Sequence, residues 1–484
     1  MMLTIEYVPS VLAALEQAFP TPPNRAKHQL DKYLALLERL MRLSLLNRSV
    51  YARRFDAYDI PLTKLINLSP TINNKKWRVH EWLAKNGHAL VHNINKNANN
   101  ITKEIAVLKP TSNLIVKNDN LLKYLLSLTA LELGAYLNAL TQDWQDLIAD
   151  YQSHYNSLSV KDRQSQYFTS PVDIPALKRY ITSIVQGATT LNRYQQENSI
   201  VQAEYVLKLA QVNNGVLQQK IDKKAFGRTY YEGVSVLSTR KELRMAFLGS
   251  SWEYDCKSCS TAWKMSFATD WHAQKKSRKL DVRQSFAAMT LYLEDKEAFF
   301  DAVILKVYNS QPTPEYKATI KEAMTALGFG AKLSLGTWRS DTGEENQSSL
   351  FEVFDRDTTV LKRFIDCFLV KQFNLEQQTL NKFIVAKFSG DAHWQAEMTA
   401  EQRRKKVKQF SAAQKIVWLY QHAETIMMDM VRAEVKKSGN TVLANVHDAV
   451  VVRNQIPAKL LAKIELKVQQ RTGVGYFRLG ETSY

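Results

Sequence analysis

The sequence contains few of the residues that interrupt or cross-link a chain. Only 3 of its 484 residues are cysteines, which excludes a disulfide framework and fits a reducing compartment. Its 16 glycines and 12 prolines are few for this length, and their scarcity favours a mainly helical protein.

The sequence also lacks the segments that direct a chain to or through a membrane. The first residues, Met-Met-Leu-Thr-Ile-Glu, do not form the basic and then apolar pattern of a signal peptide. The most apolar window, near 124–140, contains Glu132 and is too short to cross a bilayer, so it predicts a buried helix. We therefore expect a cytoplasmic protein that does not contact a membrane and that acts as a monomer.

Apolar and positively charged residues are abundant. Hydrophobic residues make up 45% of the chain and aromatic residues 10%, which suits a folded protein of two or three domains. The formal net charge of +18 favours a polyanionic partner such as nucleic acid. Charge alone leaves the activity open.

The first part of the chain has the spacing of amphipathic helices, which predicts a helical N-terminal domain over residues 1–215. Within it, the basic stretch 72–107 includes Trp77 and Trp82, which could stack on the bases of a nucleic-acid strand. The alternative, which the sequence favours slightly, is a solvated helix with two core tryptophans.

The pattern changes after Gln218. Alternating and β-branched residues at 227–237 predict a strand, and a second short strand ends at Asp255, just before a helical pattern. Residues 290–437 are nearly all helical in pattern. The segment 441–452 then predicts strand, tight turn and strand, so the fold class is α+β and mainly helical.

Two aspartates occupy similar places, each at the end of a predicted apolar strand. They are Asp255 and Asp448, and His447 precedes the second in the turn. If the two strands are neighbours, the carboxylates could hold two Mg²⁺ ions, as a phosphoryl-transfer site requires. The alternative is a pair of unrelated turn aspartates, since Asp is common in turns.

A predicted helix between these aspartates carries two lysines on one face, Lys317 and Lys321. Phe329 lies near the same face by helix geometry, and Gly330 follows it. The lysines could bind a triphosphate and the ring could stack on a base, and a lysine can also protonate departing pyrophosphate. The alternative is a surface helix with a core phenylalanine and a glycine cap.

Basic residues elsewhere have two interpretations each. Gly227-Arg228 could contact a nucleic-acid backbone near Asp255, or Arg228 could form a strand-end salt bridge. The basic run 403–408 is best interpreted as a solvated helix face, with template contact as the alternative.

The order of these motifs resembles the single-subunit RNA polymerases of phages and mitochondria, which are relatives of the Pol I-like DNA polymerases. The resemblance covers about residues 220–484. The motifs that carry it are Gly227-Arg228, Asp255 with Ser258-Cys259-Ser260, Lys321 with Phe329-Gly330, Gln421, and His447-Asp448.

The sequence departs from the family pattern at four places. Lys224 stands where Asp or Thr is usual before the Gly-Arg motif, and Cys256-Lys257 replace a single Gly after the first aspartate. Phe329 replaces a tyrosine, and no histidine precedes Gln421. The second departure leaves the alignment beyond Asp255 uncertain by one residue.

The resemblance implies a right-hand polymerase: a palm with a small antiparallel sheet, helical fingers, and the thumb-like N-terminal domain, which would bind nucleic acid. The palm would span 216–300 and 406–484, with fingers at 301–405. Substrates would be nucleoside triphosphates, the template DNA, the product RNA or DNA, and the source a bacterium, plasmid or phage.

The resemblance also implies a role for each matched residue. Asp255 and Asp448 would bind two Mg²⁺. Lys321 would be catalytic, because it would contact the phosphates and protonate the leaving pyrophosphate. The residues expected to hold the nucleotide are Lys317, Phe329, Gly330 and Ser260, and those expected to contact template or primer are Gly227, Arg228, Gln421 and His447.

The nature of the product depends on two positions. DNA polymerases of this superfamily carry a glutamate five residues after the first aspartate, where it blocks a 2′-hydroxyl. Ser260, or Thr261 in the shifted alignment, is small, which favours RNA synthesis. Phe329 argues for DNA, but a lost hydroxyl costs only about 0.5–1.5 kcal/mol, whereas a clash excludes. A DNA polymerase or primase for plasmid or phage replication is the alternative.

Two other classes of protein fit parts of the sequence. Cys256 and Cys259, with Cys367 and His272, could form a zinc or redox element. A non-catalytic, basic replication protein could bind nucleic acid and retain only the fold, and its function would survive loss of both aspartates.

Overall fold

The computed structural model describes most of the chain. The described residues are 3–22, 24–46, 57–72, 77–94, 105–117, 121–139, 153, 155–191, 193–222, 227–231, 234–274, 281–339, 345–346, 348–404 and 407–484. They form a mainly helical structure with small antiparallel sheets, as the sequence predicts. None of the described helices combines the length and apolar character needed to span a bilayer.

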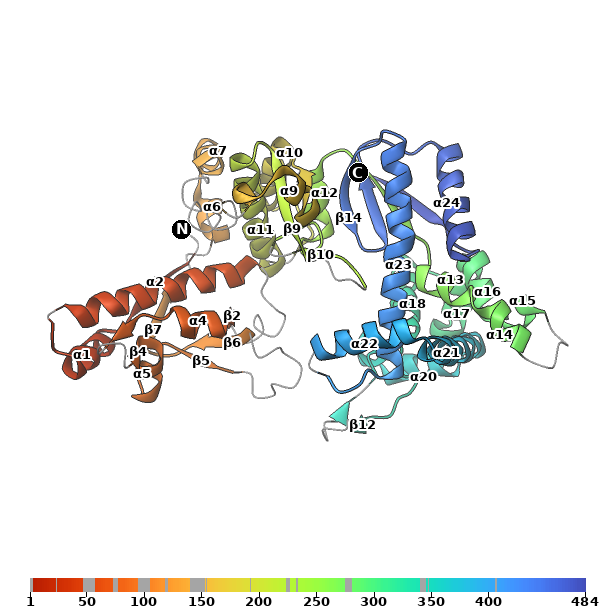
Figure 1. Cartoon of the computed structure of the whole chain (residues 1–484), viewed down its shortest axis with the longest axis horizontal. Helices are drawn as coiled ribbons and strands as arrows, with labels where there is room; N and C mark the ends of the chain where they lie inside the picture. The colour runs from red at the N-terminus through yellow and green to blue at the C-terminus, as the bar shows by residue number, and fades with distance from the viewer. Residues whose placement is uncertain are drawn as a thin grey trace. The chain divides into compact units, whose positions relative to one another are not determined.

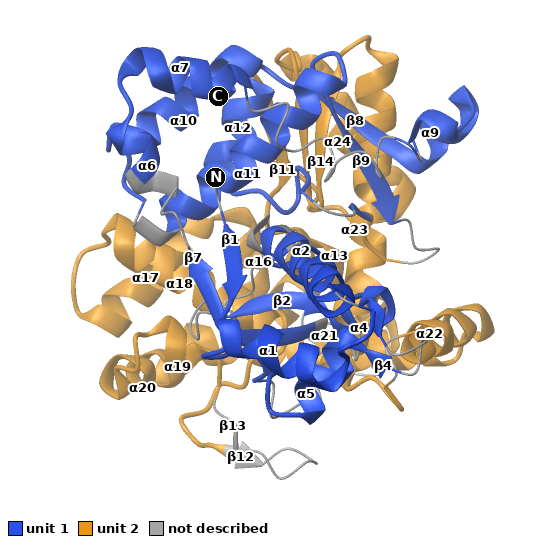
Figure 2. Ribbon diagram, turned by 90° about the vertical axis from the view of Figure 1, so that its left-hand side faces the viewer, with its two compact units in different colours: residues 1–222, 230–250 blue, residues 223–229, 251–484 orange. Residues whose placement is uncertain are grey.

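The chain divides into two compact units (Figure 2). Unit 1 comprises residues 1–222 and 230–250, and unit 2 comprises 223–229 and 251–484. Of the residues between Asp222 and Tyr230, those that the structure describes, 227–229 with Gly227-Arg228, belong to unit 2.

The first half of unit 1 is not all helical, contrary to the prediction from sequence. Helices α1 (Pro9–Ala18), α2 (Arg25–Leu46), α4 (Leu62–Leu68) and α5 (Val79–Lys85) pack with short strands. The strands are β1 (Thr4–Tyr7), β2 (Tyr58–Pro61), β3 (Thr71–Ile72), β4 (Trp77–Arg78), β5 (Val91–Asn93), β6 (Ile105–Pro110) and β7 (Leu114–Lys117). Apolar runs of four to six residues have no period that separates strand from helix, so the sequence pattern did not reveal them.

Trp77 and Trp82 both pack against the core of this half. The ring of Trp82 lies 5.5 Å from that of Phe19, and the ammonium of Lys85 lies 4.5 Å above Trp77. The stretch that contains them is a strand, a helix and a further strand, with residues 73–76 and 95–104 outside the described part. The two rings therefore act in the core of unit 1, which agrees with the structural interpretation of the sequence.

The second half of unit 1 surrounds α11 (Arg193–Val212). The other helices are α6 (Leu121–Ser127), α7 (Ala130–Ala139), α9 (Val160–Gln166), α10 (Ile174–Val185) and α12 (Lys241–Leu248). A three-stranded sheet has the order β10 (Tyr230–Tyr231), β9 (Val216–Asp222), β8 (Tyr167–Pro171). The prediction of one buried helix over the apolar window near 124–140 is wrong. The window forms two helices, because Thr129 accepts from the amide of Glu132 and starts α7, and Leu126 and Leu131 are exposed.

Among the described residues of 227–237, only the two of β10 form a strand. Beyond it, the hydroxyl of Ser238 accepts from the amide of Ser235 at 2.9 Å, and the chain turns. Serine side chains that bond to nearby backbone amides favour turns over strands.

Unit 2 is built on a four-stranded antiparallel sheet of order β14 (Val442–Val446), β15 (Ala449–Val452), β11 (Trp252–Cys256), β16 (Leu479–Ser483). All four residues of β15 are buried. The runs of β-branched residues in β14 and β15 fit a strand pair that is covered on its faces.

Helices fill the sequence between β11 and β14, as predicted. They are α13 (Cys259–Met265), α14 (Ala268–Gln274), α15 (Val282–Ser285), α16 (Ala287–Glu294), α17 (Lys296–Tyr308), α18 (Pro314–Gly328), α19 (Leu350–Val353), α20 (Thr358–Asp366), α21 (Phe368–Ser389), α22 (Ala392–Arg404) and α23 (Ala412–Lys437). A short hairpin, β12 (Trp338–Arg339) and β13 (Glu345–Asn346), interrupts them, and α24 (Ala458–Thr472) follows β15.

The longest helix of this unit, α23, runs past the sheet and on into the helical part (Figure 1). It packs against β14 and β15 and also against α13, α21 and α24. Ser411 and Gln414 form a capping box at its start. One straight element thus contacts both the sheet and the helices inserted into it.

Candidate active site

The sheet of unit 2 brings Asp255 and Asp448 together. Strand β11 pairs with β15 so that the Cα of Asp255 lies opposite that of Ala449. The amide of Cys256 donates to the backbone carbonyl of Asp448 at 2.8 Å. Asp255 on β11 and Asp448, directly before β15, are far apart in sequence but lie side by side in the fold.

The turn that presents Asp448 consists of two residues between β14 and β15. His447, its first residue, has a φ of 48°, and the favoured two-residue hairpin turns have a positive φ at this position. Histidine is among the non-glycine residues that tolerate this region. His447 lies beside Asp448 at the same edge of the sheet and is half-buried.

The environment of Asp448 disfavours its charged form. Burial raises its pKa to about 6, and the nearby carboxylates of Glu424 and Asp255 act in the same direction. A hydrogen bond from its own backbone and the charge of Arg228 oppose this shift. A cation bound at the two aspartates would remove this repulsion.

Arg228 forms a bidentate ion pair with Glu424 of α23. Its Nε and Nη2 each donate to a carboxylate oxygen at 2.6 Å, and the Glu424 side chain is fully buried. Gly227 is fixed at the same helix, because its amide donates to His422 Nδ1 at 3.3 Å and its carbonyl accepts from Thr425 at 3.1 Å. The ion pair of Arg228 agrees with the alternative interpretation of this residue, a salt bridge.

Glu424 is a residue of the site that the sequence analysis missed. It belongs to the buried face of α23, which is otherwise mostly apolar and includes Tyr420, Met427, Met428, Val431 and Val435. A charged side chain on such a stripe needs a buried partner. That signal was present in the sequence, although nothing in the sequence identified Arg228 as the partner.

Gln421 lies on the same helix, half-buried, three residues before Glu424. Its backbone carbonyl accepts from the hydroxyl of Thr425 at 2.9 Å. Gln421 and Gly227-Arg228 thus belong to one patch of unit 2.

Gly480 leaves room for the carboxylate of Asp255. It lies opposite Asp255 on β16, and a Cβ at this position would be 2.7 Å from Oδ1 of Asp255 and 3.0 Å from Cε of Lys257. Heavy atoms do not approach this closely without a shift. Gly480 is therefore a second residue of the site that the sequence analysis did not identify.

The lysines of α18 differ in their surroundings. Lys317 forms ion pairs with Glu297, and with Asp301 at 3.4 Å, both from α17. Lys321, one turn further on, is exposed. The structure thus distinguishes two lysines that the sequence places on one face of the helix.

Phe329 and Gly330 follow α18 directly, and Phe329 is its C-cap. The Phe329 ring is 39% exposed and lies 5.9 Å from the ring of Tyr420. Gly330 has a φ of +95°, and a Cβ there would be 2.8 Å from Cβ of Ala413. Glycine is required here for its conformation and for close approach to α23.

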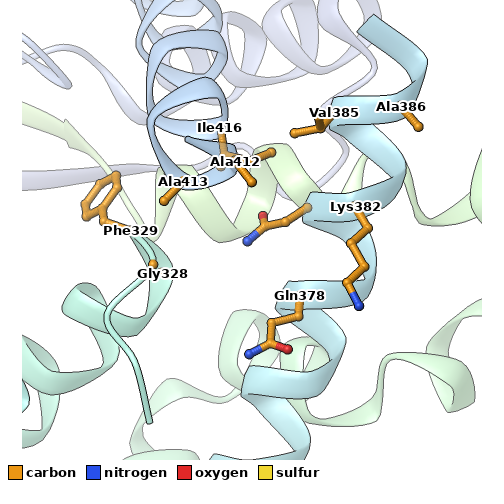
Figure 3. A pocket seen from close by; sticks show the side chains of 11 residues that line it. Gly328, Phe329, Gln378, Lys382, Val385, Ala386, Ala412, Ala413 and Ile416 are labelled. Carbon is orange, nitrogen blue, oxygen red and sulfur yellow. The ribbon is translucent and has the colours of Figure 1, made fainter. Parts of the chain in front are cut away.

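A cavity of about 420 Å³ opens beside Phe329. Figure 3 shows Gly328 and Phe329 on one side, Gln378 and Lys382 of α21 on the other, and the start of α23 above. Its size falls within the range of small-molecule sites. A planar base stacked near Phe329 would have room in it.

A buried lysine connects α13 to the end of α18. Lys264 is fully buried, and its Nζ donates to the carbonyl of Gly328 and to Oε1 of Gln377, both at 2.7 Å. Burial lowers its pKa to about 7. Lys264 therefore anchors the segment that leads into Phe329.

The small residues after Asp255 face different surroundings. Thr261 is buried, and its hydroxyl accepts from Nε2 of Gln377 at 3.4 Å. Ser260 is half-buried, and its hydroxyl has no hydrogen-bond partner among the described residues. Neither side chain carries the bulk of a glutamate.

The cysteines do not form a metal site. Cys256, Cys259 and Cys367 are buried free thiols, and burial raises the pKa of Cys256. Within the described ranges, no three His, Cys, Asp or Glu residues are placed to hold one ion, so His272 does not complete a zinc site with them.

The basic run 403–408 lies at the end of α22, where Arg403 and Arg404 are exposed and Arg404 pairs with Glu401 at 2.6 Å. Lys405 and Lys406 lie outside the described residues. These contacts fit the interpretation as a solvated helix face.

Comparisons with known proteins add a structural likeness only. No protein-family model and no curated protein matches the chain. Among solved structures, the chain is similar to the POL domain of Pol1 from M. smegmatis in complex with DNA primer-template and dNTP. The identity is 12% and the TM-score 0.35, over 92% of this chain and 81% of that one. A likeness of this degree supports no conclusion about function, so the function is inferred from the site.

Proposed function

We propose that unit 2 catalyses template-dependent nucleotidyl transfer. The observation that carries the proposal is the pairing of β11 with β15, which places Asp255 and Asp448 side by side. The helix α18, with Lys321 and Phe329, lies in the same unit. In this assignment the sheet belongs to a palm over 216–300 and 406–484, and 301–405 form the fingers.

The two aspartates have the chemistry to hold Mg²⁺. Mg²⁺ prefers oxygen ligands and is commonly held by one or two carboxylates together with waters and substrate phosphates. Burial, together with the charges of Glu424 and Asp255, raises the pKa of Asp448, and Gly480 leaves space at Oδ1 of Asp255. Two ions there would activate an attacking hydroxyl and stabilise the charge of the leaving pyrophosphate.

The other residues bind and orient the substrates in this proposal. Lys321 contacts the triphosphate and protonates the leaving pyrophosphate, which limits the charge that develops on it. Phe329 stacks on the base, with Gly330 allowing the close approach to α23. The residues that contact the template or primer in this proposal are Gln421, His447 and Arg228. Glu424 holds Arg228 in place.

The product is assigned as RNA on the basis of Ser260 and Thr261. Neither side chain can block a 2′-hydroxyl as a glutamate would. The hydrogen bond from Gln377 keeps the Thr261 side chain in the core. Phe329 favours deoxynucleotides instead, so a DNA polymerase or primase is the second candidate. A DNA template and a monomeric enzyme remain part of the proposal.

Primer extension with the purified full chain tests the proposal. We expect Mg²⁺-dependent incorporation, faster with rNTPs than with dNTPs, on DNA templates in preference to RNA. Asp255→Ala and Asp448→Ala should each lower the rate about a thousandfold or more while template binding survives.

The matched control is Asp270→Ala, which removes an exposed aspartate of α14 that pairs with Lys387 at 2.6 Å. It should keep wild-type activity. Incorporation at the wild-type rate in both site variants would refute the proposal and leave a non-catalytic nucleic-acid-binding protein. Faster incorporation of dNTPs would refute only the assignment of the product.

A further inference from the structure

Lys296, the first residue of α17, is a half-buried lysine next to the candidate active site. Its Nζ donates to the hydroxyl of Ser258 at 2.9 Å, the one hydrogen-bond acceptor it has among the described residues. The ammonium also lies 4.9 Å from the ring of Tyr292 and 5.6 Å from that of Phe300. Contacts of this kind fix the position of a cation without neutralising it.

The charges around Lys296 connect it to the catalytic aspartate. Burial lowers its pKa, and the largest opposing effect is the negative charge of Asp255. Ser258, which holds the ammonium, is the N-cap of α13 and has a φ of 48°. The ammonium is therefore held where the chain turns from β11 into α13.

Lys321 reaches the same neighbourhood from α18. Burial raises the pKa of Tyr292, and a hydrogen bond with Ser258 and the charge of Lys321 oppose this shift. Lys296 and Lys321 are thus two cations, from two helices, in the neighbourhood of Tyr292. Lys317 has ion pairs with Glu297 and Asp301 instead.

We propose that Lys296 supplies the second positive charge that binds the triphosphate of the incoming nucleotide, in place of Lys317. The inference rests on the proposed function of the same site. An ammonium has three donors, and Ser258 accepts only one of them, so two remain for phosphate oxygens. A lysine already paired with two carboxylates would have to break those ion pairs first.

The test compares four lysine variants in steady-state primer extension. Lys296→Met keeps the apolar stem on Tyr292 and removes the charge, and we expect it to raise the KM for the nucleotide about tenfold to a hundredfold. Lys296→Arg should recover much of this loss. Lys317→Met should change the KM less than about twofold, since the charge it removes is neutralised already.

Lys306→Met is the matched control, because Lys306 is an exposed residue of the same helix. It removes one positive charge outside the site and should leave the KM unchanged. A wild-type KM in Lys296→Met, or a larger increase in Lys317→Met, would overturn the inference.

Direct binding separates this inference from the proposed function. Calorimetric titration of the wild type and Lys296→Met with inorganic pyrophosphate and Mg²⁺ needs no turnover. Weaker binding in the variant, in a protein that incorporates no nucleotide, would refute the polymerase and keep the anion site. Normal incorporation with equal pyrophosphate affinity in both proteins would refute the role of Lys296 alone.

Discussion

The buried Lys264 gives the sharpest test of the structure, because its protonation should control the stability of unit 2. Its pKa is about 7 in the folded chain, against an ordinary value of 10.5. Between these pH values the unfolded chain binds a proton that the folded chain has released. The free energy of unfolding must therefore rise with pH over this interval, by up to about 1.4 kcal/mol per pH unit.

The whole effect amounts to about 5 kcal/mol, and it is absent below pH 7, where both states are protonated. Lys264→Met removes this titration and leaves the carbonyl of Gly328 and the amide of Gln377 without their donor. The free energy of unfolding of the variant should thus be lower than that of the wild type by an amount that grows as the pH rises from 7 to 10.

The assay is denaturation by urea at pH 7, 8, 9 and 10, followed by tryptophan fluorescence and circular dichroism on the full chain. The difference between wild type and variant isolates Lys264, because all other groups titrate in both proteins. Lys459→Met, at an exposed position of α24, is the control and should show no such slope. A difference that is constant over this pH range would refute the reasoning.

Three further changes test the site. Glu424→Gln removes a carboxylate next to Asp448, so the pKa of that aspartate should fall below about 6 and the acid limb of the pH–rate profile should move to lower pH. Gly480→Ala places a methyl group against Oδ1 of Asp255 and should weaken the binding of Mg²⁺. Metal titration should show that the variant needs more Mg²⁺ for activity. Gly330→Ala should destabilise the protein by about 1–3 kcal/mol through its positive φ alone, measured by denaturation.

Each of these changes has a matched control. Asp429→Asn alters an exposed acid of the same helix as Glu424, and the pH profile should not move. Gly475→Ala has no atom within 4 Å of the new Cβ and should keep the wild-type Mg²⁺ response. Gly473→Ala has a φ of +73° in open space, so a larger loss at Gly330 measures the clash with α23. Equal effects at a site and its control would contradict the corresponding assignment.

The local parts of the site could be predicted from sequence, and the long-range parts could not. Asp255 and Asp448 each follow a short apolar strand, and that pattern is visible within a few residues. The pairing of their strands brings together segments separated by a series of helices, and the sequence gives no direct information on such contacts. The family resemblance, and not the pattern, supplied that expectation.

The partners of charged residues could likewise not be predicted from the sequence. Glu424 is visible as a charge on an apolar stripe, but its pairing with Arg228 depends on where the segment 223–229 packs. Lys317 and Lys321 lie on the same face of a helical wheel. Only the position of α17, whose Glu297 pairs with Lys317, distinguishes them. The strands of the N-terminal half were missed because short apolar runs do not reveal their period.

The length of α23 has a mechanical consequence. Ala413, at its start, faces Gly330, and Glu424, eleven residues further on, holds Arg228 beside Asp448. The helix spans about 16 Å between these points and behaves as a rod over that distance. A displacement at the end of α18 must therefore be transmitted to the paired aspartates. By reciprocity, a ligand that shifts one end changes affinity at the other by the same factor as the reverse.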